Sequence, residues 1–420
     1  MTGTTRYAFV GTGHRAQLYF DALLGPYADV AEPVALCDTN PTRMAYYQRL
    51  RGGEPLPTFA PEEYLAMLDR VRPDGVVVTS VDDTHADYVV AALERGVDVI
   101  VEKPLTVDEP SCARIADAAR RSTARLVVTF NYRYSPRNSA VKALLLDGVI
   151  GTPTAVHFEW VLDTVHGADY FRRWHRDKAR SGGLFVHKAT HHFDLVNWWL
   201  ADRPSVVTAH GGLRFYGPGG DHDTDAFVLD LSADVRLHAL YADAARHDGY
   251  RRDQDVFSPG ITIEDTMAAL VRYESGALLT YSLTAYGPWE GYRVSITGTR
   301  GRIELAVCER SSVPPGRAAD VVGWHRDAPD LPEGARPVGT RLLLQRHWEA
   351  AEEVPVDAAA GTHGGGDARL LDDLFRPGAA PDPLGRAADY RDGVLSVLVG
   401  AAANASLARG GASVLVVPPW

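Results

Sequence analysis

The chain has 420 residues, 45% of them hydrophobic and 23% charged, and its 43 basic and 54 acidic side chains give a formal net charge of −11. This composition is typical of a globular protein with two or three domains, and it excludes a disordered or fibrous chain. The acidic balance argues against nucleic acid or an anionic membrane surface as a partner. The 3 cysteines are scattered, which argues against a disulfide framework. Neither a secretory signal nor a run of about 20 apolar residues is visible, so we expect a cytoplasmic protein.

Residues 1–132 alternate short apolar runs with helical patterns. Strands are expected at Tyr7–Val10, Pro33–Cys37, Gly75–Thr79, Val97–Val101 and Arg125–Phe130. Helices are expected at Arg15–Leu24, Thr42–Leu50, Pro61–Val71, Thr84–Arg95 and Asp108–Arg121. Regular alternation of this kind predicts an α/β domain with a doubly wound parallel sheet, the Rossmann arrangement.

The pattern changes in residues 133–420, which we expect to form a second, α+β domain. Helices are expected at Ser135–Leu146, Gly182–Leu200, Asp367–Phe375 and Ala387–Leu407, with an irregular segment at Asp163–Arg180. Strands are expected at Ala155–Val161 and in the alternating runs VVTAH, AFVLDL, RLHALYA, MAALVRYE, ALLTYSL and RVSITG. A long loop is expected at 308–340. Alternation of polar and apolar residues predicts a large, mostly antiparallel sheet with one covered face.

A glycine-rich turn between the first strand and the first helix predicts a dinucleotide site. Gly11 permits the tight turn, Gly13 lets a pyrophosphate approach the backbone, and Ala16 keeps the helix close to the sheet. Asp38 ends the second strand, where an acid accepts hydrogen bonds from the ribose hydroxyls. No arginine is adjacent to Asp38, which favours NAD over NADP, although Arg43 lies nearby in the sequence.

Two further motifs carry candidate chemistry. Lys103 follows the strand at Val97–Val101, and ligands bind beyond the carboxyl ends of parallel strands. An ammonium group there would stabilise a developing alkoxide. In the segment from Ser181 to Asp194, a continuous helix would place His187 and His191 on one face, with Lys188 beside them. A histidine suits general acid–base work at neutral pH, whereas a zinc site would lack the glutamate of H-E-x-x-H, so no metal is expected.

In combination, these motifs resemble the glucose–fructose oxidoreductase / inositol dehydrogenase / MocA (Gfo/Idh/MocA) family. The resemblance rests on G-T-G-x-R-A at Gly11–Ala16, T-S-x-x-x-x-H at Thr79–His85, E-K-P at Glu102–Pro104, N-Y-R-Y-S-P at Asn131–Pro136, S-G-G…H-H-F-D at Ser181–Asp194 and I-T-G-T-R-G-R-I-E at Ile296–Glu304. It implies oxidation or reduction of a sugar or cyclitol hydroxyl with NAD(P), Lys103 and His191 as catalytic residues, and a homo-oligomer, dimer or tetramer, built through the open sheet. The cofactor residues it implies are Gly11, Thr12, Gly13, His14, Arg15, Asp38, Thr79, Ser80, His85, Glu102, Lys103, Asn131 and Arg133.

The chain departs from the family pattern beside the expected base. Many members carry aspartate four residues before the catalytic histidine, and this chain has His187 there. The group that orients or balances His191 is therefore changed. The substrate-binding residues that we expect are His187, Lys188, His192, Asp194, Tyr170, Arg173 and His175. The segment Asp243–Ile263, which includes Arg252, is a further candidate for the pocket wall.

The sequence therefore predicts an NAD-dependent oxidoreductase that acts on a secondary hydroxyl of a sugar, glycoside or cyclitol. His191 would remove the hydroxyl proton and Lys103 would stabilise the oxyanion. Three alternatives remain open: a glycosidase-type elimination through transient oxidation, a non-catalytic NAD-binding sensor, and a metalloenzyme using the histidine cluster. Retention of both Lys103 and His191 argues against the sensor.

Overall fold

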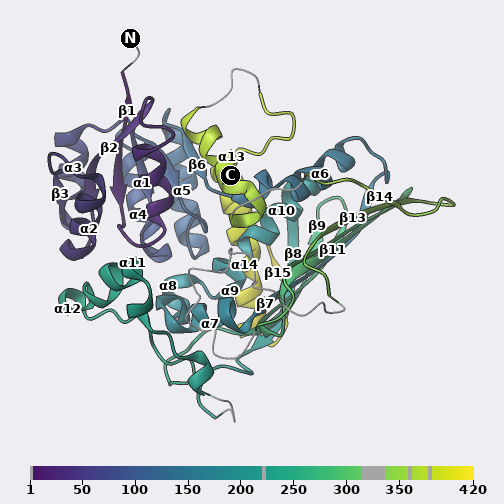
Figure 1. Cartoon of the computed structure of the whole chain (residues 1–420). Coiled ribbons are helices and arrows are strands. Elements are labelled where there is room, and N and C mark those ends of the chain that lie inside the picture. Colours follow the sequence, from purple (N-terminus) through teal and green to yellow (C-terminus); the bar gives the residue numbers. More distant parts are fainter. Residues whose placement is uncertain (1–2, 220–223, 314–335, 358–361, 377–380) are drawn as a thin grey trace.

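Two sheets organise the chain, shown in Figure 1 as a computed structural model that describes residues 3–219, 224–313, 336–357, 362–376 and 381–420. The first sheet has six parallel strands in the order β3-β2-β1-β4-β5-β6. Its strands are β1 (Thr5–Val10), β2 (Ala31–Cys37), β3 (Thr58–Phe59), β4 (Gly75–Val78), β5 (Asp98–Val101) and β6 (Leu126–Val128). This confirms the predicted Rossmann arrangement, and it brings the ends of β1, β4 and β5 to one edge of the sheet.

The helices of this half occupy the predicted places. They are α1 (Ala16–Leu24), α2 (Pro41–Arg51), α3 (Tyr64–Val71), α4 (His85–Leu93) and α5 (Glu109–Arg121), with short 3₁₀ turns at η1 (Pro61–Glu63), η2 (Asp82–Thr84) and η3 (Asn131–Tyr134). Asn40 and Asp108 cap α2 and α5 by accepting hydrogen bonds from backbone N–H groups, which explains where these helices begin. The predicted domain boundary at residue 132 lies inside η3.

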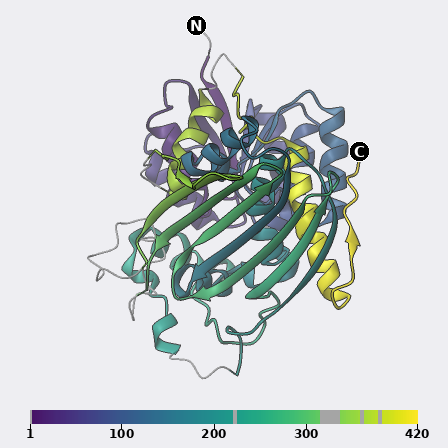
Figure 2. The ribbon, with the colours of Figure 1, turned by 90° about the vertical axis from the view of Figure 1, so that its right-hand side faces the viewer.

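The second sheet has nine strands in the order β14-β13-β12-β11-β7-β10-β9-β8-β15. They are β7 (Pro153–Asp163), β8 (Pro204–Gly212), β9 (Thr266–Tyr273), β10 (Leu278–Gly287), β11 (Glu290–Gly298), β12 (Gly301–Arg310), β13 (Gly339–Arg346), β14 (Glu352–Glu353) and β15 (Val414–Leu415). Among the described strands, β10 pairs parallel with β7 and the other pairs are antiparallel. Helices cover one face, and Figure 2 shows the other face uncovered, as predicted.

The predicted irregular segment at Asp163–Arg180 is mostly helical. It contains α7 (Thr164–Arg172), η4 (Trp174–Arg176) and α8 (Lys178–Ser181), and the Asp163 carboxylate caps α7 by accepting from the N–H groups of Val165 and His166. The predicted helix at Gly182–Leu200 is instead two helices, α9 (Leu184–His187) and α10 (Thr190–Leu200). The break falls between His187 and His191, so the argument that one helix face carries both was wrong.

Two predicted strands, AFVLDL and RLHALYA, are helical turns. The structure places η5 (Thr224–Phe227), η6 (Leu231–Ala233), α11 (Val235–Leu237), a π-helical turn η7 (His238–Ala242) and α12 (Ala245–Asp248) in this region. Asp230 and Asp234 cap these turns through their carboxylates, and such local side-chain bonds compete with strand formation. The predicted loop at 308–340 lies mostly outside the described residues.

The remaining helices tie the two halves together. They are α6 (Pro136–Leu146), α13 (Thr362–Phe375) and α14 (Tyr390–Ala408). α14 packs against α10, β8 and α5, and therefore touches both halves. α13 packs on the first sheet, where Phe375 lies edge-on to Tyr7. In the part of the chain that the structure describes, no helix is long and apolar enough to cross a membrane.

Gly167 sets how closely α7 approaches the second sheet. A Cβ atom at this position would lie 1.7 Å from the carbonyl oxygen of Ala285 in β10. The replacement Gly167→Ala should therefore lower the free energy of unfolding by about 1–3 kcal/mol or more, the cost of overpacking a rigid backbone contact. Urea denaturation would measure it. Gly212→Ala is the matched control, because its Cβ would meet only the flexible Arg214 side chain. Equal stability of both variants would contradict this packing argument.

Candidate active site

A cavity of about 1150 Å³ lies between the two sheets. Its walls come from the carboxyl ends of β1, β4 and β5 on one side, and from α7, η4, α9 and α10 on the other. Residues of the segment from Arg236 to Gln254 line it as well. The predicted site residues that line it are Gly11, Gly13, His14, Arg15, Asp38, Thr79, Ser80, His85, Glu102, Lys103, Tyr170, Arg173, His175, His187, Lys188 and His191.

The glycine-rich turn has the geometry that close approach of a ligand requires. Gly11 has φ +83, and a Cβ there would lie 2.5 Å from backbone atoms of Ser80. The Thr79 hydroxyl donates to the Gly11 carbonyl at 2.6 Å, which ties the turn to the end of β4. Gly13 offers an open backbone, since the nearest atom to a Cβ there would be the Tyr241 hydroxyl at 3.5 Å. These glycines fit a nucleotide diphosphate.

Asp38 is fixed beside this turn. One carboxylate oxygen accepts from the Thr12 N–H at 2.6 Å and from the Thr12 hydroxyl at 2.9 Å, while the other accepts from the Asn40 N–H at 2.8 Å. Thr12 does not line the cavity; it supports Asp38 instead. Arg43 lies 3.5 Å from Asp38 and forms a second, shorter ion pair with Asp248. Arg43 is therefore held between two carboxylates.

The segment from Arg236 to Gln254 covers the nucleotide side of the cavity. The His14 N–H donates to the Tyr241 hydroxyl at 3.0 Å, and the Asn40 amide donates to the Ala244 carbonyl at 2.9 Å. Burial, followed by Arg252 and Arg173, lowers the pKa of His14 to about 3, so this imidazole is neutral at physiological pH. The segment from Arg236 to Gln254 thus forms a wall on this side of the site. Figure 1 shows its helices α11 and α12 beneath the first sheet.

Glu102 holds Arg15, another predicted cofactor residue, in place. Its carboxylate accepts from Arg15 Nε at 2.5 Å and from the Tyr19 hydroxyl at 2.6 Å. Burial alone would raise the pKa of Glu102, but the Arg15 guanidinium, the Tyr19 hydroxyl and Lys103 together outweigh it, so the net pKa is lowered. Glu102 is therefore an anion committed to Arg15. His85 is likewise fixed, because its two ring nitrogens lie 2.9 Å from the Pro104 carbonyl and 3.1 Å from the Ser80 carbonyl.

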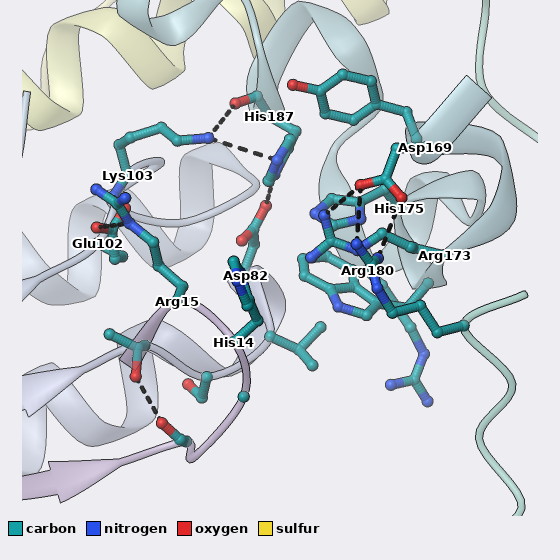
Figure 3. Close-up of a pocket in the computed structure, with 18 of the residues that line it drawn as sticks. His14, Arg15, Asp82, Glu102, Lys103, Asp169, Arg173, His175, Arg180 and His187 are labelled. Atoms are coloured by element: carbon teal, nitrogen blue, oxygen red, sulfur yellow. Dashed lines mark hydrogen bonds and ion pairs between the residues drawn. The ribbon is translucent and has the colours of Figure 1, made fainter. Parts of the chain in front are cut away.

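Lys103 and Asp82 both contact His187, as Figure 3 shows. Lys103 Nζ is 3.4 Å from His187 Nε2 and 3.2 Å from the His187 carbonyl oxygen. His187 Nδ1 is 2.5 Å from Asp82 Oδ2. Burial lowers the pKa of Lys103, although Asp82 and Glu102 oppose this shift. A carboxylate therefore lies next to position 187, where the family pattern has aspartate. This carboxylate belongs to Asp82, which follows β4 and contacts His187.

His191 and Lys188 occupy the aromatic end of the cavity. The His191 ring lies 4.5 Å from the Tyr132 ring, centroid to centroid, and Lys188 Nζ lies 4.6 Å from the centre of the Trp160 ring. Burial lowers the pKa of Lys188 to about 7, with Glu290 as the main opposing charge. This end combines flat apolar surfaces with groups that donate and accept protons, as a site for a polyhydroxylated ring requires.

Tyr170, Arg173 and His175 line the cavity as predicted. Asp169, one position before Tyr170, binds Arg173 at 3.0 Å and Arg252 at 3.1 Å. The His175 ring lies 4.1 Å from the His187 ring, centroid to centroid. Both arginines of this wall therefore pair with one buried carboxylate, and the two histidines pack against each other.

Besides Thr12, four predicted site residues lie away from the cavity among the described residues: Asn131, Arg133, His192 and Asp194. Arg133 donates to both carboxylate oxygens of Asp194, with Nε–Oδ2 at 2.8 Å and Nη2–Oδ1 at 2.5 Å. Asn131 donates to Asp367 at 2.6 Å. His192 Nδ1 lies 2.8 Å from the Tyr281 hydroxyl, inside the core. The predictions that these four contact cofactor or substrate are corrected, because their polar atoms bond to other parts of the protein away from the cavity.

Several cavity residues were missed from the sequence. They are Asp82, Asp169, Tyr241 and Glu290, whereas Asp248 and Arg252 lie in the segment Asp243–Ile263 that the sequence offered as a candidate for the pocket wall. Asp82 lies inside the Thr79–His85 motif, and a carboxylate within a motif at a strand end could have been predicted to line the site. Tyr241 could not have been found, because it lies in the run RLHALYA, which alternates like a sheet strand. In the described part of the chain, no group of three histidine, cysteine, aspartate or glutamate side chains could hold a metal ion.

Comparison with known proteins decides the family. Residues 5–130 match the profile of the oxidoreductase family, NAD-binding Rossmann fold, and residues 142–406 match that of the oxidoreductase family, C-terminal alpha/beta domain. The chain belongs to the Gfo/Idh/MocA family. The resemblance inferred from the motifs is thereby confirmed, and the protein is an oxidoreductase with an NAD-binding Rossmann domain.

Relatives of this Gfo/Idh/MocA oxidoreductase match between about half of the chain and nearly all of it. It is 35% identical over 422 residues to the putative oxidoreductase YteT of Bacillus subtilis, covering 93% of both chains. It is 28% identical over 233 residues to inositol 2-dehydrogenase of Rhizobium meliloti, covering 55% of this chain and 66% of that protein. An oxidoreductase domain protein of Kribbella flavida has the same fold, with 18% identity, a TM-score of 0.68 and coverage of 99% of this chain and 100% of that one. Levoglucosan dehydrogenase, solved with NADH and levoglucosan, also has it, with 18% identity, a TM-score of 0.67 and the same coverage.

The Arg133–Asp194 pair predicts a stability effect without a cofactor effect. Arg133→Met should lower the free energy of unfolding by about 3–5 kcal/mol, because it leaves a buried carboxylate unpaired. Arg133→Met combined with Asp194→Leu should recover most of that loss, since an apolar pair replaces the ion pair. Thermal unfolding and NAD titration would measure both effects. A large loss of NAD affinity at unchanged stability would return Arg133 to the cofactor site.

Proposed function

We propose that the protein is an NAD-dependent dehydrogenase for a secondary hydroxyl of a sugar, glycoside or cyclitol. The observation that carries this proposal is the continuity of the cavity, which has the glycine-rich turn and Asp38 along one part and Lys103 and His191 along another. The similarity to inositol 2-dehydrogenase and the fold shared with levoglucosan dehydrogenase support this class of substrate.

The cofactor residues would divide the work along the nucleotide. Gly11 and Gly13 admit the diphosphate to the backbone, and Asp38 accepts from the ribose hydroxyls. Arg173 and Arg252 both lower the pKa of His14, and both pair with the single carboxylate of Asp169. Two cations beside one anion supply positive charge near the diphosphate. When bound, NAD would supply the acceptor for the hydride that leaves the substrate carbon.

The side chains at the other end would handle the proton. His191 accepts the proton of the substrate hydroxyl, because a neutral imidazole is a base of suitable strength at neutral pH. Lys103 donates a hydrogen bond to the same oxygen as its negative charge grows. Tyr132 and Trp160 provide flat surfaces against which a sugar ring can pack, and Lys188 provides a further donor beside them.

The open face of the second sheet supports a homo-oligomer. Figure 2 shows no helix over this face, and Leu270 and Leu278 are exposed on adjacent strands of it. Neighbouring outward residues include Arg293 of β11 opposite Glu159 of β7, which would give such a contact polar specificity. We propose a dimer or tetramer through this face.

Cofactor choice gives the first functional test. Asp38 would repel a 2′-phosphate, and Arg43 is occupied by Asp38 and Asp248, so NAD should bind more tightly than NADP by about 1–3 kcal/mol. Asp248→Asn would release Arg43 from one partner and should shift the affinity ratio toward NADP by about tenfold, the scale of one hydrogen bond to a charged group. Fluorescence titration with both nucleotides would measure it, with Asp243→Asn as the control in the same segment. Tighter NADP binding by the wild type would refute the preference.

The catalytic roles give the second test. Lys103→Ala should reduce turnover by about 10²–10³, and His191→Asn by about 10²–10⁴, while the affinity for NAD persists in both. Reduction of NAD would be followed with myo-inositol, levoglucosan and a panel of pyranosides. Lys178→Ala is the matched control, since Lys178 lies outside the cavity and pairs with Glu264. Full activity of either cavity variant would remove that residue from the mechanism. Substrate consumption without net NAD reduction would favour the elimination instead.

A further inference from the structure

Contacts between Asp82, His187 and Lys103 join the two halves of the protein at the cavity wall. Asp82 lies in η2 after β4, Lys103 follows β5, and His187 ends α9 in the second domain. All three line the cavity, and Asp82 and His187 are 3% and 7% exposed. Their polar atoms follow one another at 2.5 Å and 3.4 Å (Figure 3). A carboxylate, an imidazole and an ammonium group are therefore in hydrogen-bond contact at the place where the proposed reaction occurs.

The chemistry of the three groups fixes the direction of these hydrogen bonds. An ammonium group has three donors and no acceptor, so His187 Nε2 must carry the lone pair that faces Lys103. The ring proton is then on Nδ1, from which it is donated to the Asp82 carboxylate. Burial, with Lys103, His175, Arg173 and Lys188 nearby, lowers the pKa of His187 well below its usual range, which keeps this ring neutral. One tautomer therefore satisfies both neighbours.

We propose that Asp82 and His187 are positioning residues for Lys103. Asp82 selects the tautomer of His187, His187 directs the Lys103 ammonium toward the substrate oxygen, and the Asp82 charge keeps that ammonium protonated in a buried site. This inference rests on the proposed function, in which Lys103 stabilises the oxyanion.

The surrounding charges show why Asp82 has this role and its neighbours do not. The charges that face Lys103 are Asp82, Glu102, Arg15 and Arg173, and Asp82 gives the largest opposing effect to the lowering of its pKa by burial. Glu102 contributes less and already binds Arg15 and Tyr19. Burial raises the pKa of Asp82, and Lys103 is the largest of the charges that oppose this rise, while Asp83 and Glu102 add to it and Arg173 opposes it. Removal of the Asp82 charge must therefore lower the pKa of Lys103 further.

Asp82→Asn tests the charge with little change of shape, because an amide oxygen can still accept from His187. Asp83→Asn is the matched control: it removes the adjacent carboxylate, which does not line the cavity. The chain has four lysines, Lys103, Lys142, Lys178 and Lys188, so the lysine side-chain NMR signals of the full-length protein can be assigned with Lys103→Arg. The Lys103 titration midpoint should fall by about 1 pH unit in Asp82→Asn and should not fall in Asp83→Asn.

The NMR measurement needs no substrate, so it separates this inference from the proposed function. If no sugar or cyclitol reduces NAD, the proposed function fails while the Lys103 titration still decides the role of Asp82. If turnover is found, its loss at high pH should move to lower pH in Asp82→Asn by the same interval. The turnover number should fall while KM changes little, because the substrate still binds.

Substitutions of His187 test the same positioning role independently, and they can be used if Asp82→Asn does not fold. Glutamine can accept from Lys103 with its oxygen and donate to Asp82 with its nitrogen, whereas leucine can do neither. His187→Gln should therefore retain at least about tenfold more activity than His187→Leu, the scale of one hydrogen bond to a charged group. Its Lys103 midpoint should also stay closer to the wild-type value. An unchanged Lys103 midpoint in Asp82→Asn, an equal fall in Asp83→Asn, or equal behaviour of the two His187 variants would overturn the proposal.

Discussion

Ionisable side chains buried where the two sheets meet must find partners, and this requirement shapes the whole site. Lys103, Glu102 and Asp82 all lie at the carboxyl edge of the first sheet, where a charge out of water is costly unless it is paired. Arg15 meets Glu102 within the first domain, whereas Asp82 and Lys103 meet across His187 from the second. The alignment of the two halves is therefore coupled to the hydrogen bonds of the reactive groups. A displacement of α9 would separate both the domains and the Asp82–His187–Lys103 contacts.

The same requirement explains the polar groups outside the cavity. Arg133 and Asp194 pair in the core, and Asp392 of α14 adds a second carboxylate at 3.1 Å. Asn131 binds Asp367 of α13, which also approaches Arg15 at 3.9 Å. The carboxyl-terminal helices thus bring their acids to cations and amides of the first domain. Residues that resemble a cofactor site in the sequence act here as connections between helices.

The segment from Arg236 to Gln254 gives the nucleotide side its second wall. Its contacts are made by groups that depend on one another: Asp248 binds Arg43 and Asn40, and Arg43 in turn lies beside Asp38. Asp38, the proposed ribose-binding residue, is therefore linked to a helix from the other half of the chain. The contacts of Arg43 therefore join the end of the second strand of the first sheet to α12.

The sequence alone determined the first domain, the outline of the second sheet and much of the site, because these depend on residues close together in the chain. Buried parallel strands are continuous apolar runs, Gly11 is required by a positive φ and a close backbone, and Lys103 follows a strand end, so each was visible in a short window of residues. The uncovered sheet face was visible in the alternation of β9 and β10.

Only the tertiary structure decided which polar residues face the cavity. The break between α9 and α10 separates His187 from His191, the capping carboxylates of Asp230 and Asp234 turn two alternating runs into helical turns, and Arg133 finds Asp194 rather than a cofactor. Asp82 and His187 are 105 positions apart, and their contact exists because two sheets pack together. Periodicity reports which face of an element is buried, but the partner of a buried charge depends on what the other element places opposite it.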